Sequence, residues 1–172
     1  MKVLAIDPGP AKSAIVLYES ETRVVLHHEI QDNASLLGTY ERYWWRDNEV
    51  ECCAIEMIAS YGMAVGAEVF STCVWVGRFT ERAELCDMAV YQVFRRDVKL
   101  HLCGQARAKD ANVRQALIDR FGPGKDKAIG KKKAQGPLFG IKADEWAALA
   151  VAVTFAETIV EKRREARKEK AA

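Results

Sequence analysis

Val3-Leu4-Ala5-Ile6-Asp7-Pro8-Gly9-Pro10, near the start of the chain, joins a short apolar run to a turn. The turn residues favour a buried strand over a helix, because the two prolines lack backbone donors and the glycine frees the backbone. Asp7 therefore stands at the end of a strand. It is either a turn residue bonded to its neighbours or a ligand directed out of the sheet.

A second acid closes a second apolar run, Cys52-Cys53-Ala54-Ile55-Glu56-Met57. Because side chains alternate along a strand, Cys52, Ala54 and Glu56 share one face. Burying Glu56 there costs free energy unless a cation meets it. The end of this strand therefore repeats the arrangement at Asp7.

The rest of the chain alternates between strand and helix patterns. Apolar runs predict strands over 13–18, 23–30 and 88–94, and helical spacing predicts helices over 33–45, 64–84 and 111–120, the last capped by Asp110. A final helix begins near Asp144, and its mixed-charge end, about 161–172, is predicted to be solvated.

One long irregular stretch, about 121–141, carries a basic cluster. We expect a flexible loop that contacts a phosphate backbone, because lysines beside glycines offer charge without bulk; the alternative is a solvated linker. The lysines concerned are Lys125, Lys127, Lys131, Lys132 and Lys133.

Composition predicts a single domain, residues 1–172, with 49% apolar residues. The net charge of +2 is too small to indicate a polyanion partner by itself. The five cysteines are odd in number and lack CxxC spacing, which predicts free thiols in a reducing cytoplasm. No run is apolar enough to predict a membrane span.

Three acids far apart in the sequence can meet at one point. Asp7, Glu56 and Asp144 converge if the two strands are neighbours and the last helix crosses them. Crowded carboxylates repel one another unless a cation binds, and oxygen-only ligands suit Mg²⁺ or Mn²⁺. Two such ions about 4 Å apart are a common means of cutting a phosphodiester. The pattern predicts a nuclease.

Five motifs, taken in order, resemble the RuvC family of Holliday-junction resolvases. Among the members of this family, the chain most resembles those of bacteriophages. The motifs are Val3 to Pro10, Ala54 to Met57, Val90 to Gly104, Lys109 to Val113, and Ala143 to Ala152. The resemblance implies an RNase H-like α/β fold, a five-stranded mixed sheet flanked by α-helices. It also implies a homodimer that cuts four-way junction DNA with Mg²⁺, or Mn²⁺ in its place, at two ions per site.

The resemblance also assigns roles to residues. Asp7 would bridge both ions, Glu56 and Asp144 would complete the metal ligands, and Lys109 would act near the scissile phosphate. Tyr61 lies in the loop where relatives place an aromatic that wedges into the junction, although at a different offset.

The chain departs from the family pattern at Ala147, where the family carries a second acid three residues after Asp144. Glu145 is nearby, but one step along a helix turns a side chain by about 100°. Three alternatives follow: three carboxylates suffice, Glu145 contributes as a ligand, or the protein is a branched-DNA-binding scaffold that does not cut. A two-domain ATPase of the actin or sugar-kinase type is disfavoured by length.

Overall fold

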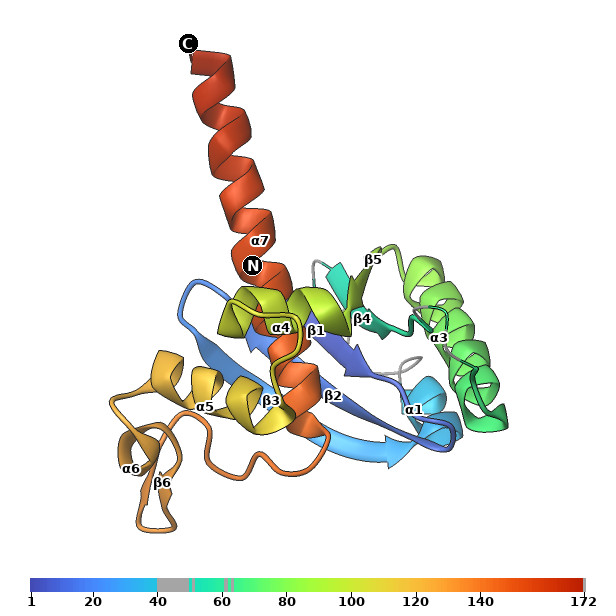
Figure 1. Cartoon of the computed structure of the whole chain (residues 1–172), viewed down its shortest axis with the longest axis horizontal. Helices are drawn as coiled ribbons and strands as arrows, with labels where there is room; N and C mark the ends of the chain where they lie inside the picture. The colour runs from blue at the N-terminus through green and yellow to red at the C-terminus, as the bar shows by residue number, and fades with distance from the viewer. Residues whose placement is uncertain (40–49, 51, 61, 63, 172) are drawn as a thin grey trace.

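The computed structural model describes residues 1–39, 50, 52–60, 62 and 64–171, and side chains as far as 158 except that of 39. A five-stranded sheet forms its centre, in the order β3-β2-β1-β4-β5 (Figure 1). The strands are β1 (Lys2–Asp7), β2 (Lys12–Glu19), β3 (Val24–Asp32), β4 (Cys52–Met57) and β5 (Ala89–Phe94).

The sheet is mixed. β1, β2 and β3 form an antiparallel meander, whereas β4 pairs with β1, and β5 with β4, in parallel. Ile6 of β1 pairs with Ile55 of β4, so the next residues, Asp7 and Glu56, leave the sheet at the same edge. This register is the reason that two acids far apart in sequence come close.

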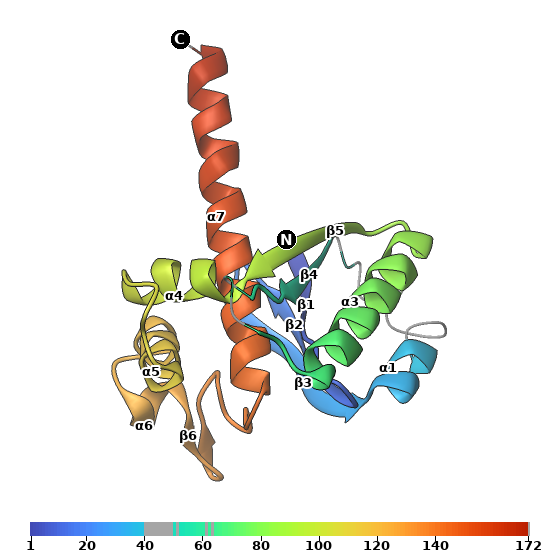
Figure 2. The same cartoon turned by 45° about the vertical axis from the view of Figure 1, so that its right-hand side comes forward.

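Helices cover both faces of the sheet (Figures 1 and 2). On one face Leu4 and Ile6 form a core with Val76 and Phe79 of α3. On the other face the alternate residues of β1 pack against α7. The helices are α1 (Asn33–Thr39), α3 (Ala67–Leu85), α4 (Arg95–Cys103), α5 (Asp110–Phe121), α6 (Lys125–Ala128) and α7 (Glu145–Ala171).

The fold class agrees with the prediction. Helix α4 was not predicted, and α7 continues to Ala171, far beyond the sheet (Figure 2). The helix expected over 33–45 is described as far as Thr39, and 40–45 lie outside the described residues.

The stretch 121–141 is more regular than predicted. It contains α6 and a hairpin of β6 (Gly130–Lys131) and β7 (Ala134–Gln135). Ala128 and Leu138 are fully buried, and the Leu138 amide donates to the Ala128 carbonyl at 2.8 Å. The segment therefore packs against α5 through buried residues, and its lysines are exposed.

All five cysteines are free thiols, buried or half-buried, as predicted. Across the described ranges, no helix has the length and apolar character needed to cross a membrane.

Candidate active site

The structure brings Asp7 and Glu56 into hydrogen-bonding contact where β1 and β4 end. Side chains alternate between the two faces of the sheet along each strand. Asp7 therefore lies on the same face as Val3 and Ala5, and Glu56 on the same face as Ala54. That face is covered by α7. The predicted convergence of these two acids therefore follows from strand parity and parallel pairing together.

The two carboxyl groups do not ionise independently. Burial, and next the charge of Glu56, raise the pKa of Asp7 to about 8. Burial also raises the pKa of Glu56, whereas the Arg95 guanidinium opposes that rise. With its pKa at about 8, Asp7 holds a proton near neutral pH and shares a hydrogen bond with Glu56.

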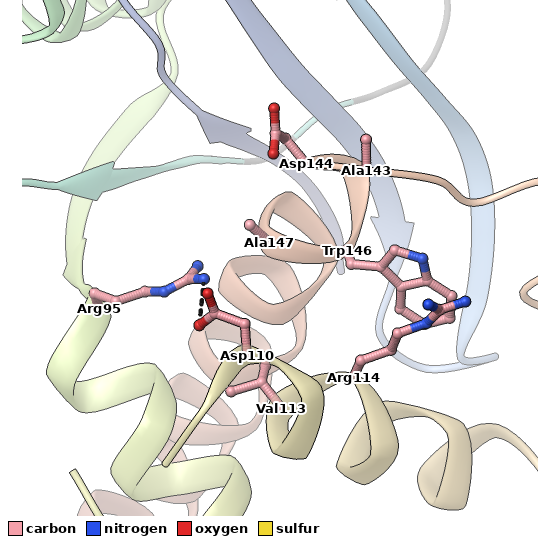
Figure 3. A pocket seen from close by; sticks show the side chains of 8 residues that line it. All are labelled: Arg95, Asp110, Val113, Arg114, Ala143, Asp144, Trp146 and Ala147. Atoms are coloured by element: carbon pink, nitrogen blue, oxygen red, sulfur yellow. Dashed lines mark hydrogen bonds and ion pairs between the residues drawn. The ribbon is translucent and has the colours of Figure 1, made fainter. Parts of the chain in front are cut away.

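Asp144 lies at the start of α7, close enough that its charge also raises the pKa of Asp7. Its exposed carboxylate follows Ala143, whose φ of 41° marks a sharp turn into the helix. Asp144 immediately precedes α7, and Ala147 on the first turn of that helix lines the same cavity as Arg95 and Asp110 (Figure 3). The helix thus brings a third carboxylate to the Asp7 and Glu56 pair.

A cavity of about 120 Å³ opens beside this acidic centre. Its wall has two arginines, two acids and small or apolar side chains: Arg95, Asp110, Val113, Arg114, Ala143, Asp144, Trp146 and Ala147 (Figure 3). The guanidinium of Arg114 stacks over the Trp146 ring, 4.6 Å from its centroid. The cavity therefore brings Asp144 together with the positive charges of Arg95 on α4 and Arg114 on α5.

Arg95 is the site residue that sequence reasoning missed. Its Nη1 lies 3.2 Å from Oε2 of Glu56, and its Nη2 lies 2.9 Å from Oδ1 of Asp110. The sequence carried one usable signal: Arg95 directly follows β5, the parallel neighbour of β4, so it leaves the sheet beside Glu56. The position of Asp110 had no such signal, because it depends on how α5 packs against α4.

The structure directs Glu145, which was predicted as a metal ligand, toward β3 and His28. Its carboxylate is 1% exposed; Oε2 accepts from the Lys142 amide at 2.8 Å and pairs with Nδ1 of His28 at 3.0 Å. These contacts hold Glu145 inside the protein toward β3. The rotation of about 100° between neighbouring helix residues therefore points Glu145 away from Asp144, and the Glu145 side chain does not bend back toward the acidic centre.

The other predicted residues lie at different places. Lys109 is exposed at the N-terminal end of α5, beside Asp110. Lys125 and Lys127 are exposed on α6, and Lys131, Lys132 and Lys133 are exposed in the β6–β7 hairpin. Tyr61 lies outside the described residues, so its proposed contact with the junction stays a prediction.

The turn after Asp7 is fixed by hydrogen bonds from side chains of α1 and α3. Asn33, which is buried, donates to the Gly9 carbonyl at 2.9 Å and accepts from the Ser13 hydroxyl at 2.6 Å. The Trp75 indole donates to the Pro10 carbonyl at 3.1 Å. A Cβ on Gly9 would lie 2.3 Å from the Lys12 carbonyl oxygen, so the turn requires glycine there. These contacts fix the end of β1 and, with it, Asp7.

Asn33→Ala is expected to destabilise the protein by about 2 kcal/mol, because buried polar groups of Gly9 and Ser13 lose their partners. Urea unfolding followed by circular dichroism measures this. Ala34→Ser, an exposed change on the next residue of α1, should leave the unfolding midpoint unchanged. Equal midpoints for both variants would contradict the assigned role of Asn33.

The donor set fits a hard divalent cation, although within the described ranges no three His, Cys, Asp or Glu side chains are arranged to hold one as they stand. Asp7, Glu56 and Asp144 supply oxygen atoms only, the ligand type that Mg²⁺ and Mn²⁺ prefer. Burial and the neighbouring carboxylates raise the pKa of Asp7, and a cation bound beside Asp7 would stabilise its charged form.

Comparison with solved structures gives matches over nearly the whole chain. Thermus thermophilus RuvC covers 90% of this chain and 92% of its own, at a TM-score of 0.62 and 20% identity. The fold is that of RuvC. T. thermophilus RuvC in complex with Holliday junction substrate matches with a TM-score of 0.63 at 19% identity, covering 90% and 92%.

A viral structure has the same RuvC-like arrangement. Fowlpox virus resolvase, in complex with Holliday junction DNA, matches at a TM-score of 0.52 and 12% identity, covering 92% of this chain and 99% of its own. No protein-family model and no curated protein matches the sequence significantly. The RuvC fold, an RNase H-like fold, is therefore established by structure, where sequence comparison alone finds no relative.

Proposed function

We propose that this protein is a metal-dependent endonuclease that cleaves phosphodiesters in four-way junctions or related branched DNA. The observation that carries the proposal is the acidic centre: Asp7 hydrogen-bonded to Glu56, with Asp144 beside them, at one edge of a RuvC-type sheet. The structural neighbours that carry Holliday junction DNA support the substrate class.

Asp7, Glu56 and Asp144 would hold Mg²⁺ or Mn²⁺ through carboxylate oxygens. Such a cation, when bound, supplies water activation and stabilises charge on the leaving oxygen. The chain's own part is to place three carboxylates at fixed strand and helix ends, with the turn after β1 held by Asn33. Lys109, exposed at the start of α5, is proposed as a basic residue near the DNA.

The proposal is tested with a labelled four-way junction, Mg²⁺ or Mn²⁺, and mapping of the cut strands. We expect nicks near the branch point that disappear in EDTA. Junction binding without nicking at any metal concentration would contradict an endonuclease.

That contradicting result would support the second candidate, a branched-DNA-binding scaffold of the same fold. Two observations favour it: Ala147 brings no acid to the cavity, and Arg95 already pairs with Glu56. Calorimetric titration with Mn²⁺ distinguishes the two candidates, because the scaffold should release no binding heat at the acidic centre.

The exposed lysines of the β6–β7 hairpin are proposed to contact the phosphate backbone. Replacing Lys131, Lys132 and Lys133 together with Gln is expected to weaken junction binding and to reduce the slope of log affinity against log salt by up to about 3. Fluorescence anisotropy at several salt concentrations measures both quantities. The matched triple change to Arg keeps the charge and should keep the slope; a slope unchanged by Gln would remove these lysines from the interface.

We also propose a homodimer through α3. Phe70 and Val74, one turn apart on this helix, are each 62% exposed and lie opposite its buried face. Phe70→Glu is expected to raise the dimer dissociation constant at least about 100-fold, because it places a charge in an apolar contact. Analytical ultracentrifugation measures the effect, and Ser71→Glu adds the same charge beside the stripe as a control. A monomeric wild-type protein would contradict the interface.

A further inference from the structure

Arg95 stands where a charged side chain is costly to hold. It is the first residue of α4, directly after β5, and is half-buried beside the ends of β1 and β4. One arm of its guanidinium contacts Glu56 at 3.2 Å, and the other contacts Asp110 at 2.9 Å. Both arms are therefore engaged, so the guanidinium has a fixed position at the edge of the acidic centre.

The contacts that fix Arg95 on its second side come from the packing of α4 against α5. Asp110 begins α5, and its Oδ1 also lies 3.4 Å from Nζ of Lys99, one turn after Arg95 on α4. Arg95 and Lys99 of α4 thus share one carboxylate of α5. Because Asp110 binds Nη2 of Arg95, the other arm of the guanidinium, Nη1, is directed at Glu56.

The charge around the cavity leaves little attraction for a second divalent ion. One oxygen of Glu56 is already bound by Arg95, and the cavity wall beyond Asp144 offers Ala147, which brings no oxygen. A second ion near Ala147 would have the positive guanidinium as a neighbour and one carboxylate fewer than the pattern that the RuvC family carries. A fixed arginine, in contrast, already supplies a positive charge at that side of the cavity (Figure 3).

We infer that the acidic centre holds one divalent cation, and that Arg95 takes the place of a second one by supplying positive charge at the DNA phosphate. This inference rests on the proposed nuclease function and refines it. Asp7 and Asp144 with the remaining oxygen of Glu56 bind the ion, whereas Arg95, held by Asp110, remains at the cavity beside Ala147. The absence of an acid at Ala147 and the presence of Arg95 would then have the same cause: the positive charge of Arg95 replaces the second ion that an acid at 147 would help to bind.

The test is the number of Mn²⁺ ions bound per chain, measured by calorimetry and by electron paramagnetic resonance without DNA. The wild-type protein should bind one ion and give the signal of isolated Mn²⁺. The double variant Arg95→Gln with Ala147→Asp removes the guanidinium and adds a carboxylate, so it should bind two ions and give the signal of a coupled pair. Ala147→Asp alone, with Arg95 in place, should stay at one.

Two controls keep the outcomes separate. Arg96→Gln, at the exposed next position of α4, should leave one ion bound, and Arg95→Lys retains a charge and should also leave one. Two ions in the wild-type protein, or one ion in the folded double variant, would overturn the inference and leave the nuclease proposal standing. Absence of bound Mn²⁺ in both wild type and Asp7→Asn would overturn the nuclease proposal, and this inference with it.

Discussion

Asp7→Asn is expected to lower the rate of junction nicking at least about 1000-fold, which corresponds to about 4 kcal/mol in the activation free energy. The amide keeps the size and the hydrogen bond to Glu56 but removes a negative ligand from the acidic centre. Junction binding should remain or become tighter, because one charge that repels the phosphates is gone. Single-turnover nicking and anisotropy measure the two effects separately.

The matched control for this prediction is Asp119→Asn. Asp119 is an exposed acid of α5 that accepts a hydrogen bond from Gln115 at 2.8 Å. This variant should nick at the wild-type rate. Equal activity of the Asp7 and Asp119 variants would reject the role assigned to Asp7, whereas equal loss in both would indicate a general effect on the fold.

In EDTA, the free energy of unfolding is expected to decrease as the pH rises from about 4 to about 8. The pKa of Asp7 is raised from 3.8 to about 8 in the folded protein, so between these values the folded chain binds a proton that the unfolded chain has lost. The stabilisation that comes from this bound proton is fully present below about pH 4 and is lost as the pH rises to about 8. At about 1.4 kcal/mol per pKa unit, the effect reaches a few kcal/mol.

Asp7→Asn should remove most of this pH dependence and should be more stable than the wild type at pH 8 without metal. Mg²⁺ should then raise the melting temperature of the wild-type protein and have little effect on the variant. Thermal melts of both proteins at pH 5 and pH 8, each with and without Mg²⁺, measure the effects of pH and of Mg²⁺ on the melting temperature. Parallel stability curves for the two proteins would contradict the raised pKa of Asp7.

The elements that sequence predicted well are those set by local pattern. β1 and β4 follow from apolar runs closed by Pro and Gly or by an acid, and their alternation placed Asp7 and Glu56 on the face that α7 covers. The start of α7 next to Asp144 was equally visible. Local sequence therefore predicted the strands that carry Asp7 and Glu56, whereas the five-stranded mixed sheet was expected from the resemblance to the RuvC family. The meeting of the acids was predicted on the condition that the two strands are neighbours, which the parallel pairing of β1 and β4 fulfils.

The features that sequence did not predict depend on contacts between distant segments. Glu145 turns toward His28 of β3, and no pattern around Asp144 contains that partner. Arg95 reaches Asp110 across the angle between α4 and α5, which neither helix specifies alone. The hairpin at 130–135 has strands of two residues each, which are too short to give a periodic signal in the sequence.

Helix α7 begins beside the acidic centre and continues through 27 residues to Ala171, well clear of the sheet (Figures 1 and 2). At about 1.5 Å per residue, its two ends are about 40 Å apart. A fluorophore attached at its last turn would therefore sit on a straight arm of known length from Asp144. If the protein binds four-way junctions as proposed, energy transfer from that dye to labelled junction arms would report how the arms are oriented relative to Asp144.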